Sequence, residues 1–145
     1  MTMSNFNLTI EEYDWSERKP RPAISDLVWR VFQHVVQIED ERLAFLSADG
    51  TGFLFHHQQD CCESVEIESV AGDLADLIGA AILLAEEVSA DGMPAQHPSD
   101  AEYGSFTWTF YKFATRKGYV DVRWYGTSNG YYSERVDLDR ITWTT

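Results

Sequence analysis

Apolar and polar residues alternate along much of this chain, and a repeat of two residues predicts β-strands rather than helices. The alternation is clearest over Ser64–Val70, where Val65 and Ile67 share one face and Glu66 and Glu68 the other. Similar patterns predict further strands at Val31–Ile38, Arg42–Ser47, Gly52–His57, Ala80–Val88, Ser105–Thr115, Tyr119–Tyr125 and Tyr131–Leu138. The expected fold is therefore mainly β (α+β), as a curved antiparallel sheet or an open barrel or sandwich.

Helical signals are few and short. Asp73 can cap a short helix near 73–78, because its side chain can accept from the first free backbone amides. The apolar residues near 26–29 fit a single helical turn. Residues 89–102 contain two prolines and a glycine, which predicts a loop.

Aromatic residues are concentrated near the end of the chain, with eleven of the twenty between residues 103 and 132. This is more ring surface than one face of a β-meander can bury. Within Ser105–Thr115 the apolar face changes side after Phe110. That change predicts either a bulge or a strand whose two ends face different layers.

Arg123 shares a predicted strand face with Tyr119 and Tyr125. A guanidinium between two tyrosines suits stacking on a flat ring or binding of a phosphate or carboxylate. The competing interpretation is a salt bridge from Arg123 to Asp121 or Asp137, beneath tyrosines that cover a second core layer. The candidate ligand-binding residues are Tyr119, Arg123, Tyr125, Asn129, Tyr131 and Tyr132.

The length of 145 residues indicates one domain with a sizeable core. Residues 1–25 are predicted to form a polar arm, because they are rich in charge and because Pro20 and Pro22 interrupt regular structure. Trp15 is the expected anchor of this arm. Residues 26–145 then form a single β-rich domain.

The net charge of −13 is unevenly distributed, since residues 1–102 carry twenty acidic and five basic side chains. Such a surface repels nucleic acid, because binding to phosphates requires lysine and arginine. It permits a basic protein partner, while the alternative is that the charge only keeps the protein soluble. The candidate acidic protein-binding residues are Glu39, Asp40, Glu41, Glu66 and Glu68.

No apolar run is long enough to predict a membrane helix, and the N-terminus lacks the pattern of a signal peptide. The two cysteines, Cys61 and Cys62, are adjacent and so cannot link distant elements. These features predict a cytoplasmic protein without a membrane partner.

A cluster of side chains that can bind metals lies at His57, Asp60, Cys61 and Cys62. Zinc prefers about four such ligands at the corners of a tetrahedron. The paired spacings typical of zinc sites are absent here, and the competing interpretation is that the thiols pack as small buried hydrophobes. Carboxylate pairs elsewhere fit solvent-facing positions, so neither a catalytic residue nor a cofactor is expected.

Four strings of residues form a recognisable set: DCCESV at 60–65, GDLADLIG at 72–79, FTWTFYKFAT at 106–115 and SNGYYS at 128–133. Through them the chain from Arg30 to Val136 resembles a family of small uncharacterised proteins, a domain of unknown function found in bacteriophage and bacterial genomes. The resemblance supplies no catalytic residue. It implies a phage or mobile-element setting, in which small acidic proteins often bind and block host machinery.

The expected function is a non-catalytic binding protein, a phage or mobile-element accessory or counter-defence factor that engages a host protein through its acidic surface. The first alternative is a protein that sequesters a small, nucleotide-like ligand on the face of Arg123. The second is a metal-dependent enzyme that uses His57, Asp60 and Cys61.

Overall fold

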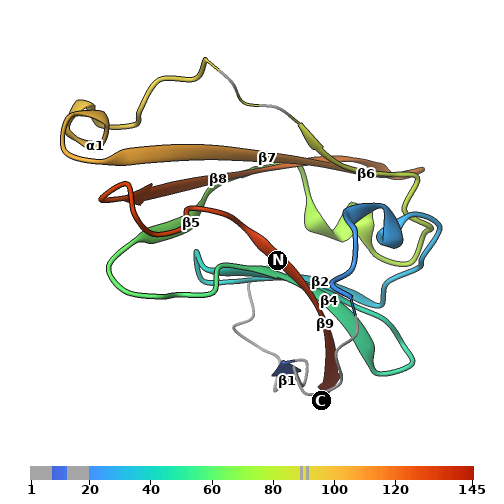
Figure 1. Ribbon diagram of the computed structural model, residues 1–145. Helices are drawn as coiled ribbons and strands as arrows, with labels where there is room; N and C mark the ends of the chain where they lie inside the picture. The colour runs from blue at the N-terminus through green and yellow to red at the C-terminus, as the bar shows by residue number, and fades with distance from the viewer. Residues whose placement is uncertain (1–7, 13–19, 89, 91) are drawn as a thin grey trace.

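The structure is a computed structural model that describes residues 8–12, 20–88, 90 and 92–145 (Figure 1). In this part of the chain two antiparallel sheets face each other. The first has the order β1 (Thr9–Glu12), β9 (Asp137–Thr144), β4 (Thr51–His56), β3 (Arg42–Leu46), β2 (His34–Ile38). The second has the order β5 (Ser64–Ala71), β8 (Gly118–Ser128), β7 (Ser105–Thr115), β6 (Leu84–Val88). The mainly β, antiparallel prediction is confirmed.

The hydrophobic core fills the space between the two sheets. Phe45 and Phe55 of the first sheet meet Phe113 and Tyr111 of the second, with ring centroids 5.0 Å apart in the pairs Phe45–Phe113 and Phe55–Tyr111. Trp124 is fully buried in the same cluster. Because each strand alternates its side chains, the residues between these apolar ones are left on the outer faces. The outer face of the first sheet carries a second apolar cluster, and the charged and polar groups discussed below lie on the remaining outer surface.

A second, smaller cluster lies on the opposite side of the first sheet. Leu54, Ile141 and Trp143 are buried there, and Leu8 and Ile10 pack against them. Ile10 pairs with Trp143 because β1 runs antiparallel to β9. The part of the polar arm that the structure describes thus includes a strand that the sequence pattern did not predict. The expected anchor Trp15 lies outside the described residues.

The helical elements are η2 (Ile24–Leu27), η3 (Leu74–Leu77) and α1 (Pro98–Glu102). The helix predicted near 73–78 is present as one 3-10 turn, and Asp73 caps it by accepting from the Ala75 amide at 2.9 Å. The prediction of a loop throughout 89–102 was wrong at α1. Proline at the first helical position fits that short helix, because its missing amide would have had no partner there.

The strand predicted at Tyr131–Leu138 was wrong in its boundaries, because β9 begins only at Asp137. Ahead of it, side chains bind the backbone in place of a neighbouring strand. The Tyr131 amide donates to Asn129 Oδ1 at 3.0 Å, and the Arg135 amide donates to Ser133 Oγ at 3.2 Å. Such local bonds compete with the ladder of a sheet. Residues 131–136 therefore connect β8 to β9 without strand structure.

The change of apolar face in β7 reflects two covered faces rather than a bulge. β7 pairs with β8 without interruption, whereas the register shift of this sheet lies in β5 between Ile67 and Ser69. Phe113 points into the core, and Trp108 lies on the outer face, where its indole donates to the Pro94 carbonyl at 2.8 Å. Residues 94–102, called here the covering arm, pass over that face (Figure 1).

Candidate functional site: an acidic strip beside two cavities

The predicted acidic residues, which come from two distant segments, lie together in the structure. The turn between β2 and β3 contacts β5, because the Ile67 amide donates to the Asp40 carbonyl at 2.6 Å. Glu39 has a φ of 51°, so the turn uses the left-handed region that few non-glycine residues adopt. All five side chains are exposed, and the name acidic strip is used for this set: Glu39, Asp40, Glu41, Glu66 and Glu68.

The acidic strip borders an open cavity of about 570 Å³ at the end of the two sheets. Glu41 and Glu66 lie on its wall, and so do Arg42, His56 and His57. This cavity is therefore mixed in charge.

A second cavity of about 400 Å³ lies between the outer face of β5 and β8 and the covering arm. Glu66, Glu68 and Asp100 contribute carboxylates to its wall, and the other wall residues include no lysine or arginine. The Tyr125 hydroxyl donates to Asp100 Oδ2 at 2.6 Å and accepts from the Gln96 amide at 2.9 Å. Burial first, and then the hydrogen bond to Asp100, raises the pKa of Tyr125. This second cavity is suited to cationic groups.

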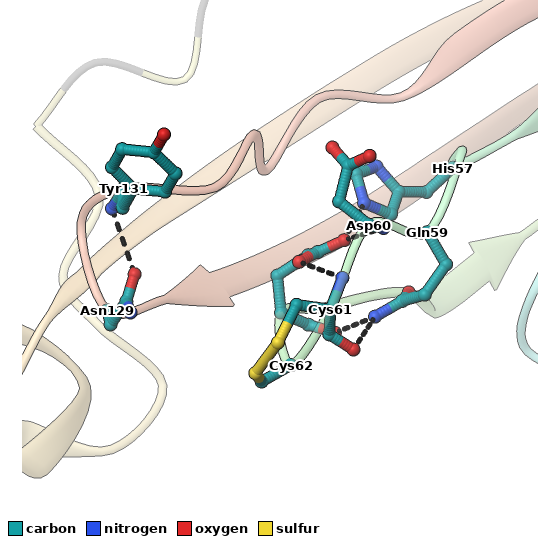
Figure 2. Close-up of a disulfide and its surroundings, with 8 residues drawn as sticks. His57, Gln59, Asp60, Cys61, Cys62, Asn129 and Tyr131 are labelled. Atoms are coloured by element: carbon teal, nitrogen blue, oxygen red, sulfur yellow. Dashed lines mark hydrogen bonds and ion pairs between the residues drawn. A yellow bond between two sulfur atoms is a disulfide. The ribbon is translucent and has the colours of Figure 1, made fainter.

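Glu63 organises the loop between β4 and β5. Its buried carboxylate accepts from the Asp60 amide at 2.6 Å, from the Cys61 amide at 3.2 Å and from His57 Nε2 at 3.0 Å (Figure 2). The Asp60 amide is the main reason that the pKa of Glu63 is lowered to about 2, although burial acts in the opposite direction. Nothing in the sequence pattern indicates this role, since Glu63 is one more acidic residue in a charged loop.

The predicted metal cluster is not assembled as a ligand set. Both ring nitrogens of His57 have protein partners, because Nδ1 lies 2.7 Å from the Arg135 carbonyl and Nε2 contacts Glu63. Cys61 and Cys62 are exposed and bonded to each other, so the interpretation of buried free thiols was wrong (Figure 2). Within the described residues no group of three or more His, Cys, Asp or Glu side chains could hold a metal ion.

A buried polar network lies at the start of β9. Asp137 accepts from Arg21 Nη1 at 2.9 Å and from the Gln58 amide at 3.0 Å. Burial acts to raise the pKa of Asp137, but these donors outweigh it and the pKa is lowered. Two residues along the same strand, Asp139 Oδ2 lies 2.6 Å from His56 Nε2. This network joins β4, β9 and the polar arm at Arg21, and every group in it has a partner within the protein.

The candidate ligand-binding residues are not one continuous platform. Tyr119 and Tyr131 are 75% and 82% exposed, whereas Tyr125 is buried under the covering arm. The Arg123 guanidinium lies 5.2 Å from the centroid of the Phe110 ring. Its predicted outward face is confirmed, because Arg123 is exposed while its neighbours in β8, Val122 and Trp124, are buried in the core.

The tyrosines after β8 lie apart from Tyr125. Tyr131 packs edge to face on Tyr132, with centroids 5.1 Å apart. Asn129 accepts a hydrogen bond from the Tyr131 amide, as Figure 2 shows. Tyr125 instead packs against Trp108 of the neighbouring strand β7, with ring centroids 4.6 Å apart.

Comparison with known proteins gives a family and no further relatives. The profile of a domain of unknown function (DUF7448) matches residues 25–138. No curated protein and no solved structure matches the chain. Within the described residues no helix is long and apolar enough to cross a membrane.

Proposed function

Since the chain belongs to the DUF7448 family, a domain of unknown function, over residues 25–138, we propose that it is a non-catalytic binding protein whose acidic strip engages a basic surface on a host protein. The proposed setting is a bacteriophage or mobile element, in which the protein serves as an accessory or counter-defence factor. That setting follows from the sequence resemblance alone. The binding mode is argued from the structure.

The observation that carries the binding mode is the contact between Asp40 and Ile67, 2.6 Å from carbonyl oxygen to amide nitrogen. It brings the carboxylates of the turn beside those of β5, so that like charges share one exposed surface. Such a surface favours a cationic partner, which removes the mutual repulsion of the carboxylates and is steered toward them during approach. The second cavity extends the surface, because Asp100 adds a carboxylate from the covering arm.

The partner can be found by placing a photo-crosslinking amino acid at Glu68, in the acidic strip, and separately at Glu86. Glu86 is equally exposed but lies on β6, at the other edge of the same sheet. A host-cell extract irradiated with each protein should yield a basic protein crosslinked from Glu68 only. An identical crosslinking pattern from the two positions would contradict the proposal.

Affinity for the purified partner then tests the charge argument. Replacing Asp40, Glu66 and Glu68 by their amides should weaken binding strongly, and amides at Glu86, Glu102 and Asp121 should not, although both variants lose the same charge. Binding by the unaltered protein should also fall steeply between about 0.01 M and about 1 M salt, where the screening length decreases from about 30 Å to about 3 Å. An affinity independent of salt would rule out the proposed mode.

A second candidate function, sequestering of a small nucleotide-like ligand, is favoured by the state of Arg123. Its guanidinium stacks on Phe110, and among the described residues it takes part in no ion pair. The competing prediction of a salt bridge to Asp121 or Asp137 is therefore not what the structure shows. A planar cation without a carboxylate partner can bind a phosphate or stack on a base. Tyr119 offers an exposed ring on the same strand face.

This second candidate predicts a thermal shift with a nucleoside phosphate at concentrations well above its dissociation constant. Arg123→Ala should remove the shift, while Arg116→Ala, which removes an equally exposed cation from the β7–β8 turn, should preserve it. A panel of nucleotides without any shift would leave the acidic strip as the sole candidate.

A further inference from the structure

Three large apolar side chains are exposed together at the end of the sandwich opposite the acidic strip. Trp29 is 74% exposed, Val31 54% and Leu83 47%. They come from two segments that pair locally, since Val31 bridges Ala81 and the Trp29 amide donates to the Ile82 carbonyl at 2.7 Å. Apolar side chains gathered on a surface in this way mark an interaction site more often than scattered ones do.

The exposure follows from the alternation of the paired segments. Phe32 and Ile82 are fully buried in the core, so the residues beside them in sequence face outward. Core packing thus accounts for the positions of Val31 and Leu83 but not for their apolar character. Polar side chains at these two positions would be compatible with the same backbone pairing. Their apolar character therefore indicates that this surface binds something.

A hollow of about 300 Å³ lies in this surface. It is lined by Val31, Leu83 and Arg116 together with three small residues, Gly79, Ala80 and Ala81. A volume of this size matches the lower end of small-ligand pockets and is sufficient for one large side chain of a partner. The hollow is therefore an anchor site rather than a flat surface.

Trp29 holds an unfavourable backbone conformation beside this hollow. Its φ is 71°, in the region that favours glycine, and tryptophan is bulky. Strain of this kind persists where the side chain has a role, and it is found most often at binding sites. Glycine would fit this backbone conformation better, so the tryptophan here costs conformational energy.

Among the described residues that line the hollow, the charged side chain is the cation Arg116, opposite in sign to the acidic strip. Arg116 lines the hollow and forms no ion pair within the described residues, and Lys117, the next residue in the chain, is exposed. Lys117 Nζ donates to the Ile78 carbonyl at 2.6 Å, which holds its charge at this edge. Tryptophan and arginine are the residues most enriched at the energetic centres of interfaces.

We propose that this surface, formed by Trp29, Val31, Leu83 and Arg116, docks a protein segment with a bulky apolar side chain flanked by carboxylates. The apolar side chain enters the hollow beside Trp29, and a carboxylate pairs with Arg116. A second copy of the chain is the less favoured occupant, because two molecules at net charge −13 repel each other. The site lies apart from the acidic strip and does not depend on it.

The test uses two short labelled peptides, both with blocked ends and a central Phe-Leu pair. One has aspartates on either side of the pair, and the other has lysines. Fluorescence anisotropy should show saturable binding of the aspartate peptide and none of the lysine peptide. If neither peptide binds, or if both bind equally, the proposal is wrong.

Four variants separate the site from non-specific adhesion. Trp29→Gly should weaken the binding of the aspartate peptide about thirtyfold, the value expected for an anchor tryptophan. The variant should not unfold, because glycine suits the positive φ of this position. Arg116→Glu should also weaken it, and Trp29→Phe should restore most of the affinity. Tyr131→Ala removes a comparably exposed ring elsewhere and should have no effect; a loss equal to that of Trp29→Gly would overturn the assignment. If sedimentation shows that the unaltered protein is a dimer and that Trp29→Gly is a monomer, the occupant of the site is a second copy of the chain, and the proposed peptide partner is wrong.

Discussion

The imidazole of His57 lies 3.0 Å from the carboxylate of Glu63, and this contact fixes the loop between β4 and β5. Both side chains are almost completely buried. The same carboxylate holds the amides of Asp60 and Cys61, so one acidic group sets the course of the loop that carries the cysteine pair. Residues predicted to bind a metal are thus used to shape the chain.

Glu63→Gln should lower the melting temperature at neutral pH, because the amide cannot accept from all three donors. The matched control is Glu66→Gln on β5, whose side chain is exposed and which should leave the melting temperature unchanged. Thermal unfolding followed by circular dichroism measures both. Equal melting temperatures for the two variants would show that Glu63 does not organise the loop.

The stabilising effect of Glu63 should also depend on pH in a defined window. Its pKa is about 2 in the folded protein and 4.5 in the unfolded chain, so the carboxylate stabilises the fold above pH 4.5. That contribution is lost as the pH falls from 4.5 toward 2. The difference in stability between the unaltered protein and Glu63→Gln should therefore shrink across this range. A difference that stays constant down to pH 2 would contradict the assignment.

Asp137→Asn should destabilise the protein by about 2 kcal/mol, because it removes the charge that Arg21 and Arg135 contact in a buried position. Asp121→Asn on β8 is the control, since that side chain is exposed. Urea unfolding measures the two free energies. If Asp137→Asn loses no more unfolding free energy than Asp121→Asn, the network at the start of β9 does not stabilise the fold.

Trp108→Phe should loosen the covering arm without unfolding the sandwich. The lost bond to the Pro94 carbonyl contributes about 1 kcal/mol, so amide exchange in residues 94–102 should rise about fivefold. Trp143→Phe is a matched control, because its indole donates to the Ser47 carbonyl at the same distance of 2.8 Å. That variant should raise exchange in the β3–β4 hairpin and leave the covering arm unchanged.

Gly72→Ala should destabilise the fold far more than Gly130→Ala. Both glycines have positive φ, 108° and 92°, but a Cβ at Gly72 would lie 2.4 Å from the Tyr119 carbonyl oxygen, whereas nothing lies within 4 Å at Gly130. The penalty for placing a Cβ at positive φ, which the two share, is about 1 kcal/mol. The excess measured for Gly72→Ala in urea unfolding reports the steric clash alone. Equal losses would mean that the backbone moves to accept the new carbon.

The sequence predicted the strands well where alternation decides the structure and poorly where side chains compete with the backbone. β7 begins and ends as expected, because its alternating aromatic residues fit no other period. The strand placed at Tyr131–Leu138 failed, because Asn129 and Ser133 divert the backbone there. The pattern of the sequence contains no record of such local hydrogen bonds.

The candidate sites were predictable as residue types but not as arrangements. The five residues of the acidic strip were named from charge alone, yet their contact depends on one bond between Asp40 and Ile67. Tyr125 was expected to be exposed and is covered, because a loop far from it in sequence folds over it. Trp29 has no motif around it, and only its backbone angle and exposure reveal it.

The place of β9 within its sheet has a consequence for how the molecule forms. β9 follows the other described strands in sequence, yet it lies between β1 and β4 and is hydrogen-bonded to both. While the ribosome still holds residues 137–144, β1 lacks its partner and β4 has one bare edge. The nascent chain therefore stays in an incomplete state, open to aggregation and to chaperones, until β9 has left the ribosome.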